Sequence, residues 1–193
     1  ITYFLKSLLT SYDKDKFKIH LYHNHDFSND VTVLEFNKYV SKYLYISKLK
    51  DLNVINKIRE DQIDIIIDLN GFSSNHRLSL FKSRLAPIQV SWCGYTNTIG
   101  LNEMDYLMVD KNLIKPQEEN LYSEKIIYLP NIWNCHSGYT IRRYENDMPQ
   151  ISNKFITFGC FNNFRKINED VIEVWSKILK HIKNSKLFFK TSI

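Results

Sequence analysis

The chain has 193 residues, of which 44% are hydrophobic and 14% aromatic, so it can form a sizeable core and is not intrinsically disordered. Its net charge is only +5, and its lysines are scattered among acidic residues, which argues against a nucleic-acid partner. No apolar run approaches the roughly 18 residues of a membrane helix, so we expect no membrane partner.

The three cysteines, Cys93, Cys135 and Cys160, are far apart and lack CxxC spacing. This usage argues against a disulfide framework or a zinc site and favours a reducing compartment, so we expect a cytoplasmic protein. The chain begins in an apolar helical pattern and stops just after a strand pattern. We therefore expect it to be a piece of a longer protein.

Helix and strand patterns alternate along the first 130 residues. Apolar spacing predicts helices over 4–9, 31–40, 52–58 and 78–82. Strand patterns fall at 17–22, 43–46, 63–69, 88–92, 105–109 and 126–129. The stretch 63–69 is β-branched and nearly continuous, which is typical of a strand covered on both faces. The alternation predicts a doubly wound, mainly parallel, Rossmann-like sheet in an N-terminal domain spanning 1–130.

Residues 131–153 have little periodicity and are interpreted as an interdomain connection. A strand at 155–158 follows. Asn168 is a plausible helix N-cap, with acidic residues in the first turn, and a strand at 187–189 comes after the helix. The segment 154–193 is thus predicted to be the first βαβ unit of a second Rossmann-like domain.

A polar loop after the strand at 88–92 offers hydroxyl, amide and backbone N–H groups. These groups suit sugar hydroxyls or phosphate oxygens, because each is a directed hydrogen-bond partner. An ordinary turn capped by Asn and Thr is the alternative, which spacing alone leaves open. The candidate residues are Gly94, Tyr95, Thr96, Asn97 and Thr98.

A second polar loop follows the strand at 63–69 and contains Asn70, Gly71, His76 and Arg77. Open α/β sheets bind ligands at the carboxyl ends of their strands, so we interpret these four residues as lining the same cleft. His76 could donate a hydrogen bond to a substrate, and a solvated loop histidine is the alternative.

A third candidate loop, with Asn163 and Lys166, lies between a strand and a helix N-terminus, where anions are favoured. A solvated loop is an equally good interpretation, because no P-loop or GxGxxG motif is present. His23 and His25 lack a third ligand with suitable spacing, so we predict no metal site. Cys93 is interpreted as a small buried residue.

Several stretches match one enzyme family in order and residue pattern. They include Asp68-Leu-Asn-Gly, Arg84-Leu-Ala-Pro-Ile-Gln-Val-Ser-Trp-Cys-Gly-Tyr, Met104-Asp-Tyr-Leu-Met-Val-Asp and Phe161-Asn-Asn-Phe-Arg-Lys-Ile. Together they resemble the catalytic region of the O-linked N-acetylglucosamine transferase and SPINDLY-type glycosyltransferases. The matches spread across most of the chain, so the resemblance is specific.

The resemblance implies a GT-B fold and metal-independent transfer of a sugar, with N-acetylglucosamine the expected one, from a UDP-sugar to Ser or Thr hydroxyls of a protein or peptide acceptor. No cofactor is implied beyond the UDP-sugar donor, and tetratricopeptide repeats are expected upstream. Gly94 to Thr98 match the family's donor loop, while Asn163 and Lys166 match its donor-binding amide and phosphate-binding lysine.

Two observations keep an alternative open. Thr96 and Asn97 stand where the family has Pro-Gly, and most of the C-terminal lobe lies outside the sequence. A non-catalytic, Rossmann-like binding module derived from such an enzyme is therefore the alternative function. We expect the 193-residue piece to be inactive by itself, and we assign no catalytic residue.

Overall fold

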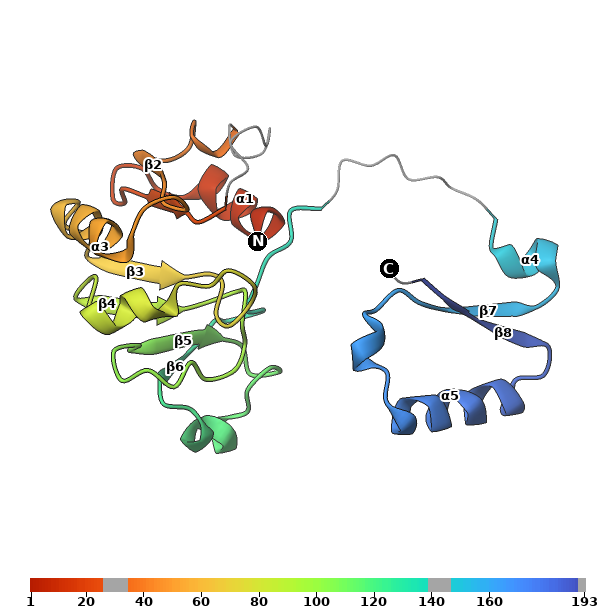
Figure 1. Cartoon of the computed structure of the whole chain (residues 1–193). Coiled ribbons are helices and arrows are strands. Elements are labelled where there is room, and N and C mark those ends of the chain that lie inside the picture. Colours follow the sequence, from red (N-terminus) through yellow and green to blue (C-terminus); the bar gives the residue numbers. More distant parts are fainter. Residues whose placement is uncertain (26–34, 139–146, 191–193) are drawn as a thin grey trace. The chain divides into compact units, whose positions relative to one another are not determined.

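The computed structural model describes residues 1–25, 35–138 and 147–190 (Figure 1). Its chain divides into two compact units, Ile1–Tyr139 and Thr140–Ile193. The boundaries predicted from the sequence, with lobes at 1–130 and 154–193 joined by 131–153, stay a prediction.

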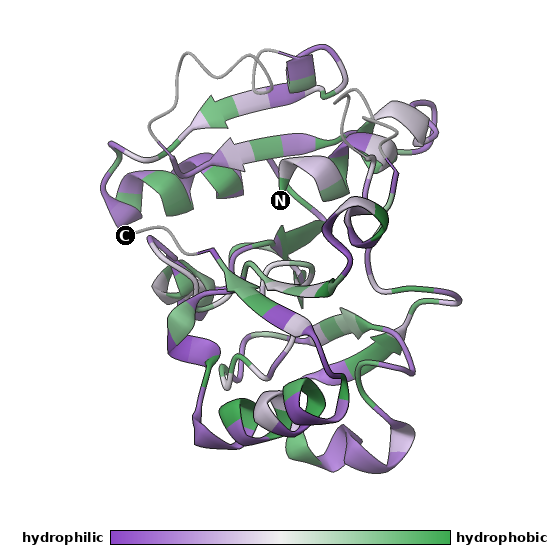
Figure 2. Cartoon of the chain, turned by 90° about the vertical axis from the view of Figure 1, so that its right-hand side faces the viewer, coloured by the Kyte–Doolittle hydropathy of each residue, from purple (hydrophilic) through white to green (hydrophobic). Residues whose placement is uncertain are grey.

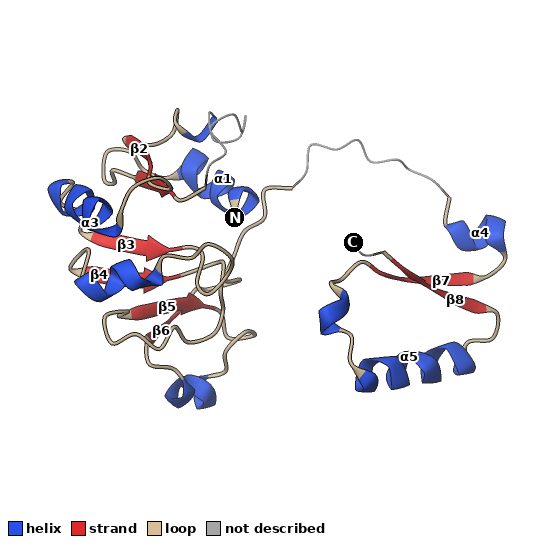
Figure 3. Cartoon of the chain, viewed as in Figure 1, coloured by secondary structure: helices blue, strands red, loops and turns tan. Residues whose placement is uncertain are grey.

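The strands of the first unit form two sheets, and every pairing is parallel (Figure 3). The larger sheet has the order β3-β4-β5-β6, and the smaller sheet pairs β1 with β2. This arrangement confirms the predicted α/β class with a mainly parallel sheet. The strands are β1 (His20–His23), β2 (Lys42–Tyr45), β3 (Ile65–Asp68), β4 (Ile88–Ser91), β5 (Tyr106–Val109) and β6 (Lys125–Tyr128).

The helices between these strands are short. Within the described residues, the α-helix α1 (Thr2–Ser11) precedes β1, and the α-helix α3 (Asp51–Glu60) and the 3-10 helices η1 (Leu78–Ser83) and η2 (Pro116–Leu121) lie between later strands. In α3 the buried Val54 and Ile58 lie one turn apart, and Asp51 at the start of the helix complements its dipole. No helix in the described part of the chain is long and apolar enough to cross a membrane.

Helices α1 and α3 pack on opposite faces of the strands. Leu9 of α1 belongs to a core cluster that includes Leu21 of β1, whereas Ile58 of α3 belongs to a cluster that includes the next residue, Tyr22. Successive residues of a strand point to opposite faces, so the two helices cover different faces, as the doubly wound prediction requires. The helices carry apolar and polar residues side by side (Figure 2).

The prediction that 63–69 is covered on both faces is wrong for one face. Ile66 is buried, but Ile65 is 52% and Ile67 is 42% exposed. The side chains of Ile65 and Ile67 alternate with that of Ile66, so they point to the other face, which the described helices leave open there.

Four other segments differ from the prediction or extend it. Part of the helix predicted over 31–40 lies outside the described residues, and residues 37–39 form a turn. The segment 78–82 is the 3-10 helix η1, which ends where Arg84 adopts a left-handed conformation with φ of 46°. The pattern missed η2 and a five-residue helix, α4 (Pro149–Asn153), which lack a full helical turn of buried apolar residues.

The second unit is a βαβ unit, as predicted. Strands β7 (Ile156–Cys160) and β8 (Ser185–Phe189) pair in parallel on either side of α5 (Glu169–His181) in the sequence. The Asn168 side chain accepts a hydrogen bond from the backbone N–H of Val171, which confirms the predicted N-cap. The 3-10 helix η3 (Phe164–Lys166) lies between β7 and α5. No described residue of this unit is fully buried.

Candidate functional site

The loops after β3 and β4 touch at the carboxyl edge of the larger sheet. Gly71 has a φ of +55°, and a Cβ atom on it would lie 2.0 Å from Cβ of Tyr95. A Cβ on Gly94 would lie 2.0 Å from the carbonyl oxygen of Leu69. Neither glycine could carry a side chain without moving a neighbour, so two candidate residues are glycines because the loops interlock.

An aromatic group covers this junction. The ring of Phe72 meets the ring of Tyr95 edge-on at a centroid distance of 5.4 Å and that of His76 at 5.6 Å. Phe72 is 50% exposed, although its neighbours in the loop are polar. A partly exposed aromatic ring beside amide groups suits the apolar face of a sugar ring. Phe72 is not among the site residues predicted from the sequence, although an apolar residue in a polar loop is a visible signal.

Hydrogen bonds within the first loop hold its backbone. The Asp68 carboxylate accepts a bond of 2.7 Å from the N–H of Gly71. Burial raises the pKa of Asp68 above its ordinary value, although the bonds from backbone N–H groups and the charge of His76 oppose that rise. The Asn70 side chain donates to the Ser74 carbonyl and accepts from the Ser73 hydroxyl. Both ends of its amide are therefore hydrogen-bonded within the loop.

Arg77 does not lie free in the loop. Its guanidinium donates to the carbonyl oxygens of Ile46 at 2.9 Å and Leu49 at 3.0 Å, and it forms an ion pair with Asp51. Only 17% of its side chain is exposed. Arg77 therefore ties the loop after β3 to the start of α3, whereas His76 is exposed.

The second loop is anchored through Thr98. Its Oγ1 donates to the buried carboxylate of Glu124 at 2.8 Å, and Ile99 N–H donates to the other carboxylate oxygen at 2.7 Å. Tyr95 and Thr96 are half-buried, and Asn97 is exposed, with its Oδ1 accepting from the Thr98 N–H. Asn97 is thus the exposed polar side chain of this loop, whereas Thr96 is half-buried. Glu124 is a positioning residue that the sequence did not single out.

Asn163 and Lys166 lie together in the second unit. The Asn163 side chain caps η3 by accepting from the N–H of Arg165 at 3.0 Å, and the N–H of Lys166 donates to the Asn163 carbonyl. Both residues are exposed. The loop thus presents a fixed turn and a solvent-facing ammonium group, which suits an anionic ligand.

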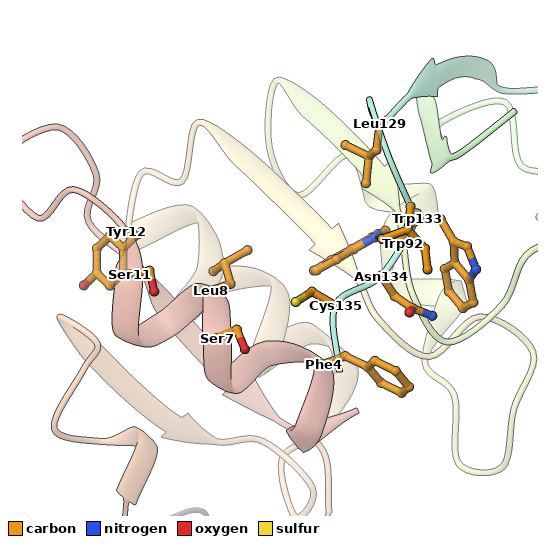
Figure 4. A pocket seen from close by; sticks show the side chains of 11 residues that line it. Phe4, Ser7, Leu8, Ser11, Tyr12, Trp92, Leu129, Trp133, Asn134 and Cys135 are labelled. Carbon is orange, nitrogen blue, oxygen red and sulfur yellow. The ribbon is translucent and has the colours of Figure 1, made fainter. Parts of the chain in front are cut away.

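Within the described ranges, no group of three or more His, Cys, Asp or Glu side chains is arranged to hold a metal ion. A groove of about 410 Å³ lies instead beside α1, lined mostly by apolar side chains (Figure 4). Trp92 forms part of its wall, and its indole N–H donates to the Trp133 carbonyl at 2.6 Å. None of the candidate site residues lines this groove.

Comparison with known proteins supports a common origin with glycosyltransferases. The model of glycosyl transferase family 41 matches residues 1–143. The probable UDP-N-acetylglucosamine–peptide N-acetylglucosaminyltransferase SPINDLY of Hordeum vulgare is 35% identical over 194 residues, covering 98% of the chain and 20% of that protein. The protein named SEC from Arabidopsis thaliana is 33% identical over 76% of the chain and 16% of its own length.

Among solved structures, a mutant O-GlcNAc transferase of Thermobaculum terrenum matches with a TM-score of 0.87 and 30% identity. The match covers 97% of this chain and 35% of the other. It supports the GT-B-type, Rossmann-like class. The chain spans about a fifth of the length of the curated SPINDLY relatives, which are several times longer.

Proposed function

Because the chain belongs to glycosyl transferase family 41, we propose that the protein containing it transfers N-acetylglucosamine from a UDP-sugar to Ser or Thr hydroxyls of proteins. The observation that carries the proposal is the interlocked pair of loops at the carboxyl edge of β3 and β4. They lie in a chain that aligns over 98% of its length with peptide N-acetylglucosaminyltransferases. Such an edge is where open α/β sheets hold their ligands.

In this proposal the loop after β4 contacts the donor. Gly94 and Tyr95 shape its backbone, Thr98 anchors it on Glu124, and Thr96 and Asn97 present a hydroxyl and an amide. Asn70 and Gly71 support the loop from the neighbouring strand, and His76 adds a donor near the exposed ring of Phe72. These groups would orient sugar hydroxyls through directed hydrogen bonds.

Lys166 supplies positive charge in the proposed reaction. As the bond from the sugar to the diphosphate breaks, negative charge develops on the leaving UDP, and a fixed ammonium group lowers the energy of that state. Asn163 holds the turn that presents Lys166. We propose that this lysine takes the place of a metal ion, so that the enzyme needs neither a metal nor another cofactor.

The remaining features of the whole protein are proposed from its relatives and its sequence. Its acceptor would be a protein or peptide, with tetratricopeptide repeats upstream, and nucleic acid or membrane would not take part. A cytoplasmic location is supported by Cys93, Cys135 and Cys160, which are free thiols. We propose that residues 1–193 alone do not catalyse transfer, because the chain spans a fifth of its relatives.

A non-catalytic binding module is the second candidate. It is favoured by Thr96 and Asn97, which replace the Pro-Gly expected from the family pattern. These two residues change the shape that the loop presents to a donor. Such a module would bind UDP or a glycan without turning it over.

Calorimetry on the full-length protein with UDP and UDP-N-acetylglucosamine, paired with a peptide transfer assay, distinguishes the candidates. We expect Lys166→Ala to lower turnover by about 100-fold or more, as loss of one electrostatic stabiliser does elsewhere. Lys177→Ala is the matched control, because Lys177 is exposed on α5 and pairs with Glu173. Unchanged turnover in Lys166→Ala would refute its role, and binding without transfer in the unmodified protein would favour the module.

A further inference from the structure

The net charge of the chain lies in its second unit. Residues 1–139 contain sixteen Lys and Arg and sixteen Asp and Glu, whereas residues 140–193 contain ten Lys and Arg against five Asp and Glu. The second unit therefore carries the whole formal charge of +5. A general surplus of lysine would raise the charge of both units alike, so the asymmetry points to a partner of opposite charge.

The charges of this unit are also separated in space. Glu169, Asp170 and Glu173 lie in the first half of α5, where the first two complement the positive end of the helix dipole. Lysines gather instead where α5 ends and where the parallel strands β7 and β8 begin, and these three places lie on one side of the unit (Figure 1). We call this set the lysine edge; it consists of Lys154, Lys180, Lys183 and Lys186.

Contacts within the unit hold the lysine edge together. The Asn184 side chain donates to the carbonyl oxygen of Lys154 at 2.9 Å, which joins the residue before β7 to the turn before β8. Thr157 is the register partner of Lys186, and the Lys186 ammonium lies 4.0 Å from the centroid of the Phe155 ring. The charges are therefore carried by segments whose relative positions are fixed.

No acidic side chain pairs with the lysine edge in the described part of the chain. All four lysines are exposed and none of them forms an ion pair there, whereas the neighbouring Lys177 pairs with Glu173. Lys180 lies in the last turn of α5, where a cation stabilises the end of the helix. The other three lysines lie outside the helix, so the helix dipole does not account for them.

We propose that the lysine edge binds an acidic segment of a partner protein. Like charges held on one side of a unit repel one another, and the carboxylates of such a segment would offset that repulsion. Nucleic-acid surfaces combine arginine forks with aromatic rings that are open to the bases. The lysine edge contains no arginine, and the ring that contacts it, Phe155, is half-buried and in contact with the Lys186 ammonium.

The segment would bind away from the donor. The lysine edge lies at the amino ends of β7 and β8, whereas Asn163 and Lys166 follow the carboxyl end of β7. Open α/β sheets hold their ligands at the carboxyl ends of the strands. Binding at the lysine edge is therefore separate from the function proposed above and can be measured without any transfer reaction.

Fluorescence anisotropy of a labelled peptide made of Asp and Glu residues, titrated with the full-length protein, tests the proposal. We expect the double variant Lys180→Gln and Lys183→Gln to weaken binding by about 5-fold or more, because each exposed ion pair contributes a small free energy. Lys82→Gln with Lys111→Gln is the matched control, since it removes the same charge from exposed lysines of the first unit. Thermal unfolding of both double variants shows whether the fold is retained.

A second pair of substitutions keeps the test independent of the stability of α5. Lys154→Gln with Lys186→Gln removes the same charge from the strand side of the lysine edge, and we expect a similar loss of affinity. Binding should also weaken as salt is raised, because salt screens exposed charges.

Several results would overturn the proposal. One is that the acidic peptide does not bind the unmodified protein. Another is that the control pair loses as much affinity as the lysine-edge pairs, which would mean that binding follows net charge and not this surface. Tighter binding of single-stranded DNA or of vesicles of anionic phospholipid, lost in the lysine-edge variants, would assign the surface to a different class of partner.

Discussion

Gly94 passes so close to Leu69 that a Cβ atom on Gly94 would lie 2.0 Å from the Leu69 carbonyl oxygen. The contact joins the loop after β4 to the end of β3, and the neighbouring contact of Gly71 with Tyr95 joins them a second time. The relative position of the two candidate loops is therefore set by backbone packing, and only glycine fits at either contact.

Gly94→Ala is expected to destabilise the full-length protein by about 3 kcal/mol or more, because a backbone oxygen cannot rotate away from the added methyl group. Gly100→Ala is the matched control: its φ is +69°, but nothing lies within 4 Å of the added atom. The control should cost only about 1–2 kcal/mol, from the left-handed backbone. Chemical denaturation measures both variants, and equal losses would show that the Leu69 contact does not restrict this position.

Arg77→Lys should lower the free energy of unfolding by about 1–3 kcal/mol. A lysine ammonium cannot reproduce the branched guanidinium, whose N–H groups bond Ile46, Leu49 and Asp51 at the same time. Arg59→Lys is the control, since exposed Arg59 donates to a single carbonyl, that of Ser83. Thermal unfolding gives the stability, and calorimetry gives the UDP affinity. A loss of affinity with unchanged stability would show that Arg77 acts on the ligand rather than on the loop.

Thr98→Val removes the hydroxyl that donates to Glu124 at 2.8 Å and leaves this buried carboxylate with fewer partners. We expect a loss of about 1–3 kcal/mol in unfolding free energy. Thr96→Val should change stability by less than about 0.5 kcal/mol, because Thr96 is only half-buried. Limited proteolysis of the loop, compared between the variants, reports the local effect. Equal rates of proteolysis in the two variants would show that Thr98 does not anchor the loop.

Gln89 is fully buried, and its side chain bonds the backbone N–H of Leu85 and the carbonyls of Phe81 and Glu103. Gln89→Met keeps the volume but leaves three backbone groups without their side-chain partner, two of them in buried bonds, so we expect about 3 kcal/mol or more of destabilisation. Gln117→Met, at an exposed position, is the matched control. Similar denaturation midpoints for the two variants would mean that water or another group replaces the lost bonds.

Asp110 makes the stability of the fold depend on pH in the acid range. Burial alone would raise its pKa, but hydrogen bonds from the backbone N–H groups of Trp133, Leu113 and Asn112 outweigh it and hold the pKa below its ordinary value. The stabilisation is complete above the unfolded-state pKa of about 3.9 and is lost as the pH falls from there through the folded-state value.

Unfolding free energy measured from about pH 5 downward should therefore fall less steeply in Asp110→Asn than in the unmodified protein, since the asparagine does not titrate. Asp15→Asn, at an exposed position, should leave the slope unchanged. A slope that is the same in Asp110→Asn and in the unmodified protein would show that Asp110 does not carry this dependence.

The sequence by itself determined the fold class and where the candidate loops fall along the chain. Hydrophobic periodicity located α3, β3, β4 and α5 within a few residues, because these elements bury a regular stripe or run. It located Asn168 as an N-cap, which is a local property. It also located the brief helix at 78–82, which is the 3-10 helix η1. It missed η2 and α4, because short helices without a buried stripe leave no periodic signal.

Only the tertiary structure decided what each loop residue does. From the sequence, Arg77 and Thr98 were predicted to contact the ligand. In the structure each instead bonds to another segment of the chain, Arg77 to Asp51 and Thr98 to Glu124. Likewise, the exposed faces of Ile65 and Ile67 follow from which elements lie against β3. Such contacts join residues many positions apart, so no local pattern encodes them; they arise when parallel strands bring their carboxyl ends to one edge.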